Sequence, residues 1–215
     1  EIKKFNKEEL NNLGKLNYKD LATEIIFNFC KEEVSKKELK SLIEKSYKNF
    51  KDEEVVNLKR LGDINLLELY NGPTLAFKDI AMQVIGNLYE HLKVGKEKSL
   101  NILVATSGDT GSAAIAALNN RKNINLFVLH PHNKISNIQR KIMTTLGGSN
   151  IYNIAIKGSF DDCQKIVKEL FNDDNFRLKI NMSGVNSINW ARIICQIVYY
   201  FYSYFKLKKK NINFS

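Results

Sequence analysis

Residues 101–112 read Asn-Ile-Leu-Val-Ala-Thr-Ser-Gly-Asp-Thr-Gly-Ser and join a short apolar run to an alanine-rich segment. A run of this length bounded by glycine is typical of a buried strand, and the alanines that follow favour a helix. The same alternation then continues along the chain. Further apolar runs lie at 124–129, 151–156 and 178–182, and helices are expected over 110–120, 135–146 and 160–172. This order predicts an α/β fold, with an open parallel sheet and helices on both faces.

The pattern changes on both sides of this α/β unit, which we assign to residues 99–185. The first 60 residues are charged and helical in period, so we expect residues 1–98 to form a helical N-terminal segment. Residues 186–215 contain a long helix, expected over 188–205, followed by an apolar run like the opening of another strand. Because a parallel strand needs neighbours, we expect the sequence to be truncated at the start of a second domain.

The amino-acid composition excludes several classes of function. The 215 residues carry a formal net charge of +10, from 28 lysines and only 5 arginines. Arginine usually leads in phosphate and base recognition, so we expect a solvated lysine surface and no nucleic-acid partner. Cys30, Cys163 and Cys195 lie far apart and lack metal-ligand spacing with histidine, which predicts free thiols, a cytoplasmic location and no metal. The apolar stretch 193–205 is too short to cross a membrane.

The loop after the first strand offers groups for an anion. The hydroxyls of Ser107, Thr110 and Ser112, with the free amides of a helix N-terminus, predict an anion cradle. In an open α/β sheet, ligands bind at the carboxyl ends of strands, where this loop falls. It has neither the ending of a Walker A loop nor the third glycine of a dinucleotide fingerprint. Asp109 is unexpected in an anion cradle, which favours a separate role for it over an ordinary capped helix start.

Residues 186–192, Asn-Ser-Ile-Asn-Trp-Ala-Arg, repeat this arrangement. Ser187 can cap the helix, Asn186 and Asn189 offer amide donors, and Arg192 adds a cation one turn into the helix. A phosphate suits such a site through charge-assisted hydrogen bonds. The alternative is a well-capped helix with a surface arginine.

Lys78, within Asn-Gly-Pro-Thr-Leu-Ala-Phe-Lys-Asp at 71–79, is the third chemical feature. It falls on an apolar stripe of helical spacing, formed by Leu75, Met82, Ile85, Tyr89 and Leu92. Loss of hydration there would favour the neutral amine, a nucleophile toward carbonyl groups. Alternatively, the stem packs and the ammonium reaches solvent. With two anion sites elsewhere, the amine predicts an enzyme of amino-acid chemistry that uses an aldehyde cofactor.

Three motifs in this chain resemble those of threonine synthases of the bacterial and fungal type. They are Gly72-Pro-Thr-Leu-Ala-Phe-Lys-Asp79, Ala105-Thr-Ser-Gly-Asp-Thr-Gly111 and Asn186-Ser-Ile-Asn189. Shorter segments fit in the same order along nearly the whole chain: Lys134-Ile-Ser136, Leu146-Gly-Gly148 and Phe160-Asp-Asp-Cys-Gln164. The resemblance implies a pyridoxal 5'-phosphate enzyme of fold type II, the tryptophan-synthase-β fold. Such enzymes convert O-phospho-L-homoserine and water to L-threonine and phosphate.

The resemblance also implies residue roles. Lys78 would hold the cofactor through a Schiff base and then move protons on the substrate. One loop would bind the substrate carboxylate: Ser107, Gly108, Asp109 and Thr110. Asp109 would also lie against the cofactor, at a position where related enzymes carry asparagine. The other loop would hold the substrate's phosphate: Asn186, Ser187 and Arg192.

Family members continue past a strand like Ile212-Asn-Phe-Ser215 into a Gly-Asn-Phe-Gly loop that holds the cofactor phosphate. That loop is not in this sequence, so we expect the chain alone to be inactive. Two other interpretations stay open: another fold type II enzyme, such as a serine/threonine dehydratase or a cysteine synthase, and a non-catalytic truncated relative. The phosphate site argues against the first, and retention of Lys78 argues against lost chemistry. The oligomeric state is left open.

Overall fold

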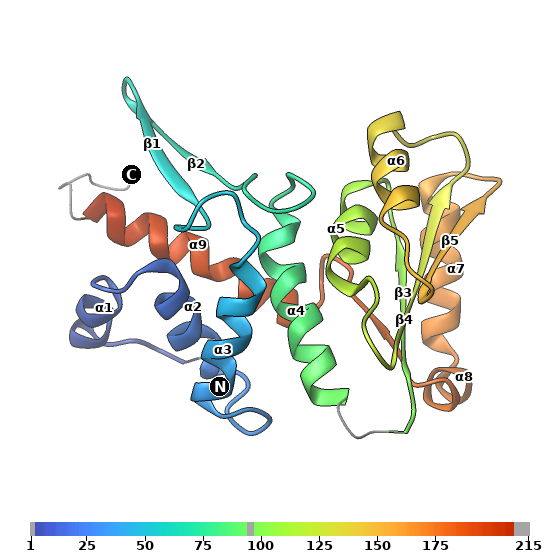
Figure 1. The fold of residues 1–215 in the computed structure, drawn as a ribbon, viewed down its shortest axis with the longest axis horizontal. Coiled ribbons are helices and arrows are strands. Elements are labelled where there is room, and N and C mark those ends of the chain that lie inside the picture. The colour runs from blue at the N-terminus through green and yellow to red at the C-terminus, as the bar shows by residue number, and fades with distance from the viewer. Residues whose placement is uncertain (1–2, 94–96, 209–215) are drawn as a thin grey trace. The chain divides into compact units, whose positions relative to one another are not determined.

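The computed structural model describes residues 3–93 and 97–208 (Figure 1). The chain forms two compact units, one comprising Glu1–Val84 with Ile193–Ser215 and the other Ile85–Arg192. Two helices contribute residues to both units, α4 (Lys78–Lys93) and α9 (Trp190–Lys208). The strand expected at 211–215 lies outside the described residues.

A parallel sheet forms the centre of the second unit. Among the described residues it has four strands in the order β5-β4-β3-β6. Their bounds are Leu100–Ala105 for β3, Ile124–Pro131 for β4, Ile151–Ile156 for β5 and Met182–Gly184 for β6. The inner strands β3 and β4 are largely buried, which explains why their sequences are nearly continuous apolar runs. The predicted α/β class with a parallel sheet is confirmed.

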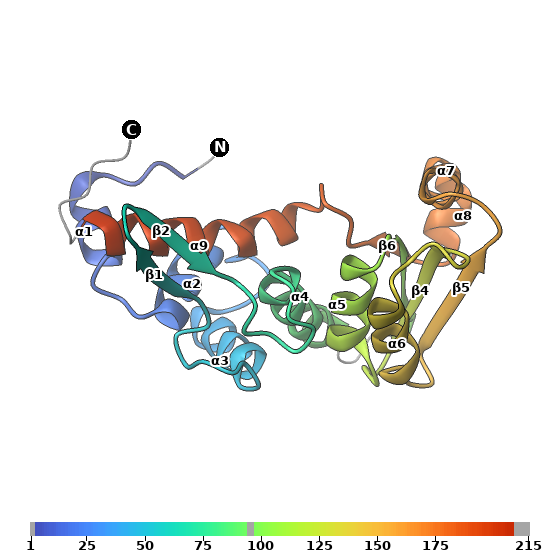
Figure 2. The same cartoon turned by 90° about the horizontal axis from the view of Figure 1, so that it is seen from above.

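Helices cover both faces of this sheet. Figure 2 shows α5 (Asp109–Leu118) and α6 (Asn137–Thr145) on one face, and α7 (Phe160–Asn172) and α8 (Asp174–Lys179) on the other. Beneath α7 a buried cluster joins Leu103 and Leu129 of the sheet to Cys163 and Val167 of the helix. The helix begins as predicted. The Ser159 hydroxyl accepts from the Asp162 backbone amide at 3.2 Å, and the Asp162 carboxylate accepts from the Ser159 amide at 2.6 Å.

One predicted strand is misplaced. The run 178–182 was expected to be extended, but its first half belongs to α8 and the strand β6 begins only at Met182. Asp173 caps α8, because its carboxylate accepts from the Phe176 backbone amide at 2.9 Å. Asn181, with φ of 52°, then turns the chain into the sheet. The cap therefore outweighs the strand propensity of the apolar run.

The N-terminal segment is helical up to Tyr47, as predicted, but its later part contains two strands that were not expected. Its helices are α1 (Lys7–Leu13), α2 (Tyr18–Phe27) and α3 (Lys36–Tyr47), capped by Asn6, Asn17 and Ser35 respectively. Their apolar faces meet in a core that includes Leu21, Leu39 and Ile43, all buried. The Tyr18 and Tyr47 rings pack edge to face, with centroids 5.8 Å apart. Within the described residues, no helix is both long and apolar enough to cross a membrane.

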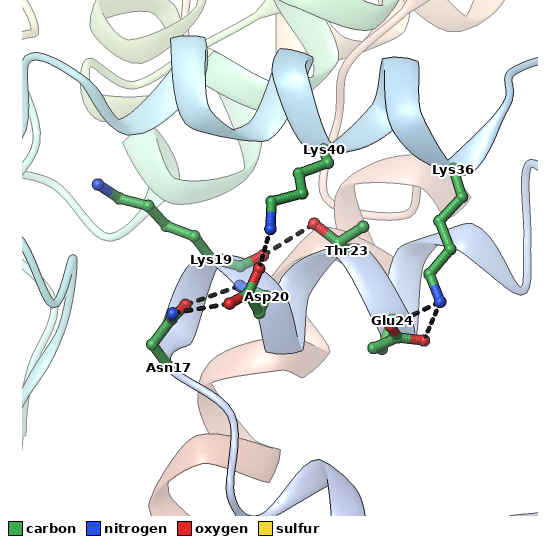
Figure 3. A network of polar contacts seen from close by, with 7 residues as sticks. All are labelled: Asn17, Lys19, Asp20, Thr23, Glu24, Lys36 and Lys40. Atoms are coloured by element: carbon green, nitrogen blue, oxygen red, sulfur yellow. Dashed lines mark hydrogen bonds and ion pairs between the residues drawn. The ribbon is translucent and has the colours of Figure 1, made fainter.

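Polar contacts join α2 to α3 along their exposed side (Figure 3). The Lys40 ammonium lies 2.8 Å from the Asp20 carboxylate, and the Lys36 ammonium lies 2.6 Å from the Glu24 carboxylate. The hydrogen bond from Lys40 lowers the pKa of Asp20 below its usual value, and the Asn17 amide adds to this effect. These pairs are half exposed, so each contributes little to the stability of the fold.

A hairpin missed from the sequence precedes α4 in the chain. Its strands β1 (Asn57–Leu61) and β2 (Ile64–Glu68) pair in antiparallel fashion. Gly62 and Asp63 form the two-residue turn, and Gly62 has φ of 60°, which glycine adopts without steric cost. Gly-Asp between two apolar residues is a known hairpin signal and could have revealed these strands.

We expect Lys40→Met to lower the urea midpoint of unfolding slightly at pH 7, because an exposed ion pair contributes little. The loss has a defined pH dependence. Since the folded-state pKa of Asp20 is lowered, the contribution is present above about pH 4 and disappears as the pH falls through that lowered pKa. Lys19→Met is the control, because its ammonium points away from the network in Figure 3. An equal effect of both variants would contradict the role given to the pair.

Candidate functional site

Thr106 shapes the loop between β3 and α5. Its buried hydroxyl oxygen accepts hydrogen bonds from the backbone amides of Gly108 and Gly111, both at 2.9 Å. Gly108 has φ of 142°, a conformation that side-chain-bearing residues rarely adopt. The role of Thr106 was not predicted from the sequence. A hydroxyl directly after a buried strand and two residues before a glycine was the available signal.

The predicted cradle groups of this loop divide into two sets. Ser107 and Asp109 are exposed and Thr110 is half-buried, so these side chains remain accessible to a ligand. Ser112, in contrast, is only 2% exposed, and its hydroxyl donates to the Gly108 carbonyl at 3.0 Å. The expectation that Ser112 faces an anion is therefore wrong, because the loop uses its hydroxyl internally. The accessible part can still bind a carboxylate at the positive end of α5.

Asn189 shapes the second loop, which follows β6. Its side-chain amide donates to the Gly184 carbonyl at 2.8 Å, and its side-chain oxygen accepts from the Arg192 backbone amide at 3.0 Å. Asn189 is thus the cap of α9, and the prediction that Ser187 caps this helix is wrong. Ser187 lies three residues before the first helical residue, Trp190, too early in the chain for that geometry.

The groups expected to hold a phosphate differ in exposure. Asn186 and Ser187 are exposed, and the Asn186 side-chain oxygen accepts from the Ile188 amide at 3.1 Å in a local turn. Arg192 is only 4% exposed, and its Nη1 donates to the Val185 carbonyl at 3.3 Å. The alternative of a surface arginine is therefore wrong. A buried guanidinium places positive charge in the loop that carries the two exposed side chains.

Both loops lie at one edge of the same sheet. Strands β3 and β6 run parallel and pair directly, with Leu103 opposite Gly184. The first loop begins at Thr106, just after β3, and the second begins at Val185, just after β6. The two loops therefore begin at neighbouring strand ends, and each leads into the N-terminus of a helix. This arrangement can bind two negatively charged groups of one small molecule.

Lys78, in the first unit, is the first residue of α4 and is half-buried. Its Nζ lies 4.2 Å from the centre of the Phe77 ring, a cation–π contact. Met82 and Ile85 are buried, as the apolar stripe predicts, but Leu75 is 56% exposed, with φ of 60°. The helix therefore does not include Leu75, and Lys78 begins the stripe. An ammonium at the positive end of a helix does not stabilise that helix, which favours a chemical role.

Asp79 holds the turn that presents Lys78. Its carboxylate is fully buried and accepts from the Thr74 amide and the Thr74 hydroxyl, both at 2.7 Å. A Cβ atom on Gly72 would lie only 2.4 Å from the Asp79 Cβ, so this approach requires glycine. From the sequence, Asp79 was predicted only as the last residue of a family motif. A charged residue directly after the lysine, on a helix of apolar character, was the signal of a positioning role.

Comparisons with known proteins cover nearly the whole chain. The family model described as pyridoxal-phosphate dependent enzyme matches residues 54–212, and that described as threonine synthase N terminus matches residues 1–47. The threonine synthase of Eremothecium gossypii is 48% identical over 89% of this chain and 40% of its own length. That of Saccharomyces cerevisiae is 44% identical over 91% of this chain and 41% of its own.

A solved structure of the pyridoxal-phosphate-bound threonine synthase from Brucella melitensis is similar to this fold, with a TM-score of 0.86 and 38% identity. The match covers 97% of this chain and 45% of that one. The chain therefore spans less than half the length of the relatives it matches.

We expect Asp79→Ala to lower the free energy of unfolding by about 1–3 kcal/mol, because it leaves the Thr74 amide and hydroxyl without their buried acceptor. Urea unfolding at neutral pH measures this change. Glu32→Ala, which removes an exposed carboxylate, is the control and should change the unfolding free energy by less than about 0.5 kcal/mol. Equal stability of the two variants would contradict the positioning role of Asp79.

Proposed function

The chain belongs to the family of pyridoxal-phosphate-dependent enzymes, and we propose that it carries the lysine and the substrate-binding loops of a threonine synthase. The reaction would be a lyase reaction that converts O-phospho-L-homoserine and water to L-threonine and phosphate. One observation carries the proposal: two loops that lead into helices begin at neighbouring strand ends, one with groups suited to a carboxylate and the other beside a buried arginine. The proposed substrate has one carboxylate and one phosphate.

The residues of the first unit fit pyridoxal 5'-phosphate as a cofactor. A primary amine is the group that binds an aldehyde covalently, and Lys78 presents one from a turn fixed by Asp79. When bound, this cofactor supplies the electron sink for chemistry at the substrate's carbon atoms. Lys78 would hold the cofactor through a Schiff base and later move protons between substrate carbons.

The first loop of the second unit would bind the substrate carboxylate. The groups that would do so are the hydroxyls of Ser107 and Thr110 and the backbone around Gly108. Thr106 already engages the Gly108 and Gly111 amides, so it fixes the loop before a ligand arrives. This preorganisation reduces the conformational entropy that binding would otherwise cost.

The second loop would bind the substrate's phosphate. Asn186 and Ser187 are exposed donors, and Arg192 supplies a buried positive charge held by the Val185 carbonyl. Charge-assisted hydrogen bonds of this kind are stronger than neutral ones. The same groups would stabilise the phosphate as it leaves. A dehydratase acting on serine has no phosphate to place here, so this loop favours the phosphorylated substrate.

A cytoplasmic location is part of the proposal. Among the described residues the cysteines are free thiols, with Cys163 and Cys195 buried and Cys30 half-buried. Burial raises the pKa of the Cys195 thiol to about 12, which makes it unreactive. Free thiols of this kind suit a reducing compartment.

We expect the full-length protein to show a visible absorption band when pyridoxal phosphate is added, and Lys78→Ala to abolish both the band and turnover. The reason is that the band requires a covalent link to an amine. Lys122→Ala, which removes an exposed lysine, should leave both unchanged. A Lys78→Ala variant that keeps the band would show that Lys78 is not the residue that binds the cofactor. Turnover of serine but not of phosphohomoserine would favour a dehydratase instead.

Ser187→Ala should raise the KM for phosphohomoserine roughly fivefold, because one hydrogen bond to the phosphate is lost. Its thermal midpoint should hardly change, since Ser187 is exposed. Steady-state kinetics of the full-length protein test this, with Ser41→Ala on α3 as the exposed-serine control. If KM is unchanged in both variants, Ser187 does not contact the substrate.

A further inference from the structure

Gln139, in the first turn of α6, connects this helix to the proposed carboxylate loop. Its Nε2 donates to Asp109 Oδ1 at 2.6 Å. Its Oε1 accepts from the Ser136 hydroxyl at 2.9 Å and from the Ser136 backbone amide at 3.4 Å. The Ser136 hydroxyl in turn accepts from the Gln139 amide at 3.2 Å, which completes a capping box. One side chain therefore caps its own helix and also contacts the loop.

The capping box decides which end of the Gln139 amide faces the loop. The backbone N–H of Ser136 can only donate, so the atom beside it must be the amide oxygen. The nitrogen then faces Asp109, and because it too can only donate, Asp109 Oδ1 must be an acceptor. In this arrangement Asp109 Oδ1 carries no proton. A proton on the Asp109 carboxyl could therefore reside only on Oδ2.

Two glycines show that α6 packs closely on the same loop. A Cβ atom on Gly108 would lie 2.2 Å from Cδ and 2.3 Å from Oε1 of Gln139. A Cβ atom on Gly111 would lie 2.9 Å from Sδ of Met143, a buried residue one turn further along α6. The contact thus involves loop backbone as well as a side chain. Glycine at both positions therefore permits this close approach of α6.

We propose that Gln139 is a positioning residue that holds Asp109 on the α6 side of the carboxylate loop. The proposal rests on the proposed function, in which this loop binds the substrate carboxylate. An exposed aspartate in such a loop would repel that carboxylate if it turned toward the ligand. Gln139 prevents this by holding the aspartate through a hydrogen bond, and Ser136 holds Gln139 in turn. This accounts for an acidic residue in an anion-binding loop.

Gln139→Glu tests the role in the full-length protein loaded with pyridoxal phosphate. Glutamate preserves the Ser-x-x-Glu capping box, so the thermal midpoint should change little. It removes the N–H donor and places a second carboxylate beside Asp109, so the KM for phosphohomoserine should rise roughly tenfold or more while the cofactor band remains. Gln139→Leu, which lacks the donor but adds no charge, should raise KM by a smaller factor. An unchanged KM in both variants overturns the proposal.

Two controls separate positioning from helix capping. Ser136→Ala removes the cap and should lower the thermal midpoint, but it leaves the donor to Asp109 and should raise KM less than Gln139→Glu does. Glu38→Gln replaces the acid of the α3 capping box with the amide, which is the opposite change to Gln139→Glu. It should leave KM unchanged, because α3 does not carry the proposed loops. If Ser136→Ala and Gln139→Glu raise KM equally, Gln139 acts only through helix stability and the proposal fails.

A readout without turnover distinguishes this proposal from the proposed function. In protein labelled with ¹⁵N-glutamine, the Gln139 side-chain amide signals should shift as Asp109 titrates, and Asp109→Asn should abolish that shift. If the signals do not respond to pH, the contact is absent and the proposal is overturned even in an active enzyme. If they respond but phosphohomoserine is not turned over, the positioning contact is confirmed and the proposed function fails.

Discussion

The parallel pairing of β3 with β6 is the constraint on which the second unit depends. It brings the loops that follow β3 and β6 to neighbouring strand ends, although the two strands are separated by most of the unit's sequence. Parallel neighbours require a long crossover, and here the intervening chain supplies β4, β5 and the helices on both faces. The fold therefore brings together the two loops that we propose to bind the substrate's carboxylate and phosphate. Neither loop alone would distinguish a doubly charged substrate from a simple anion.

Buried or half-buried polar side chains determine the shape of each loop. Thr106 holds the first, Asn189 holds the second, and Asp79 holds the turn before Lys78. Each accepts hydrogen bonds from backbone or side-chain donors. Folding removes these donors from water, so without these side chains they would lack an acceptor. This internal use of polar groups leaves the exposed side chains for a ligand. Residues that shape these loops are thus distinct from residues that would contact the substrate.

The two charged side chains of the loops also differ in burial. Arg192 is buried within its loop, whereas Asp109 is exposed and held from outside by a residue of α6. A buried cation strengthens the attraction of a loop for phosphate, because the low local dielectric screens it less. An anion in the neighbouring loop would oppose carboxylate binding unless it is kept in one orientation. The two charged side chains are therefore held differently: Arg192 by a carbonyl of its own loop, and Asp109 by a side chain of α6.

Sequence patterns were sufficient wherever an interaction lies within a few residues. The apolar runs located β3, β4 and β5, and the helix expected over 160–172 matches α7. The motifs around Lys78, Ser107 and Asn186 gave the family, though their roles in binding stay predictions. The cap of α9 was predicted wrongly, because Ser187 and Asn189 can both cap a helix. Which of them does so depends on the residue at which the helix begins, and the sequence pattern does not fix that residue. The contact between Gln139 and Asp109 spans 30 residues, and only the packing of α6 on α5 brings them together. Spacing along a chain specifies turns and caps, whereas strand order and helix packing arise from long-range burial.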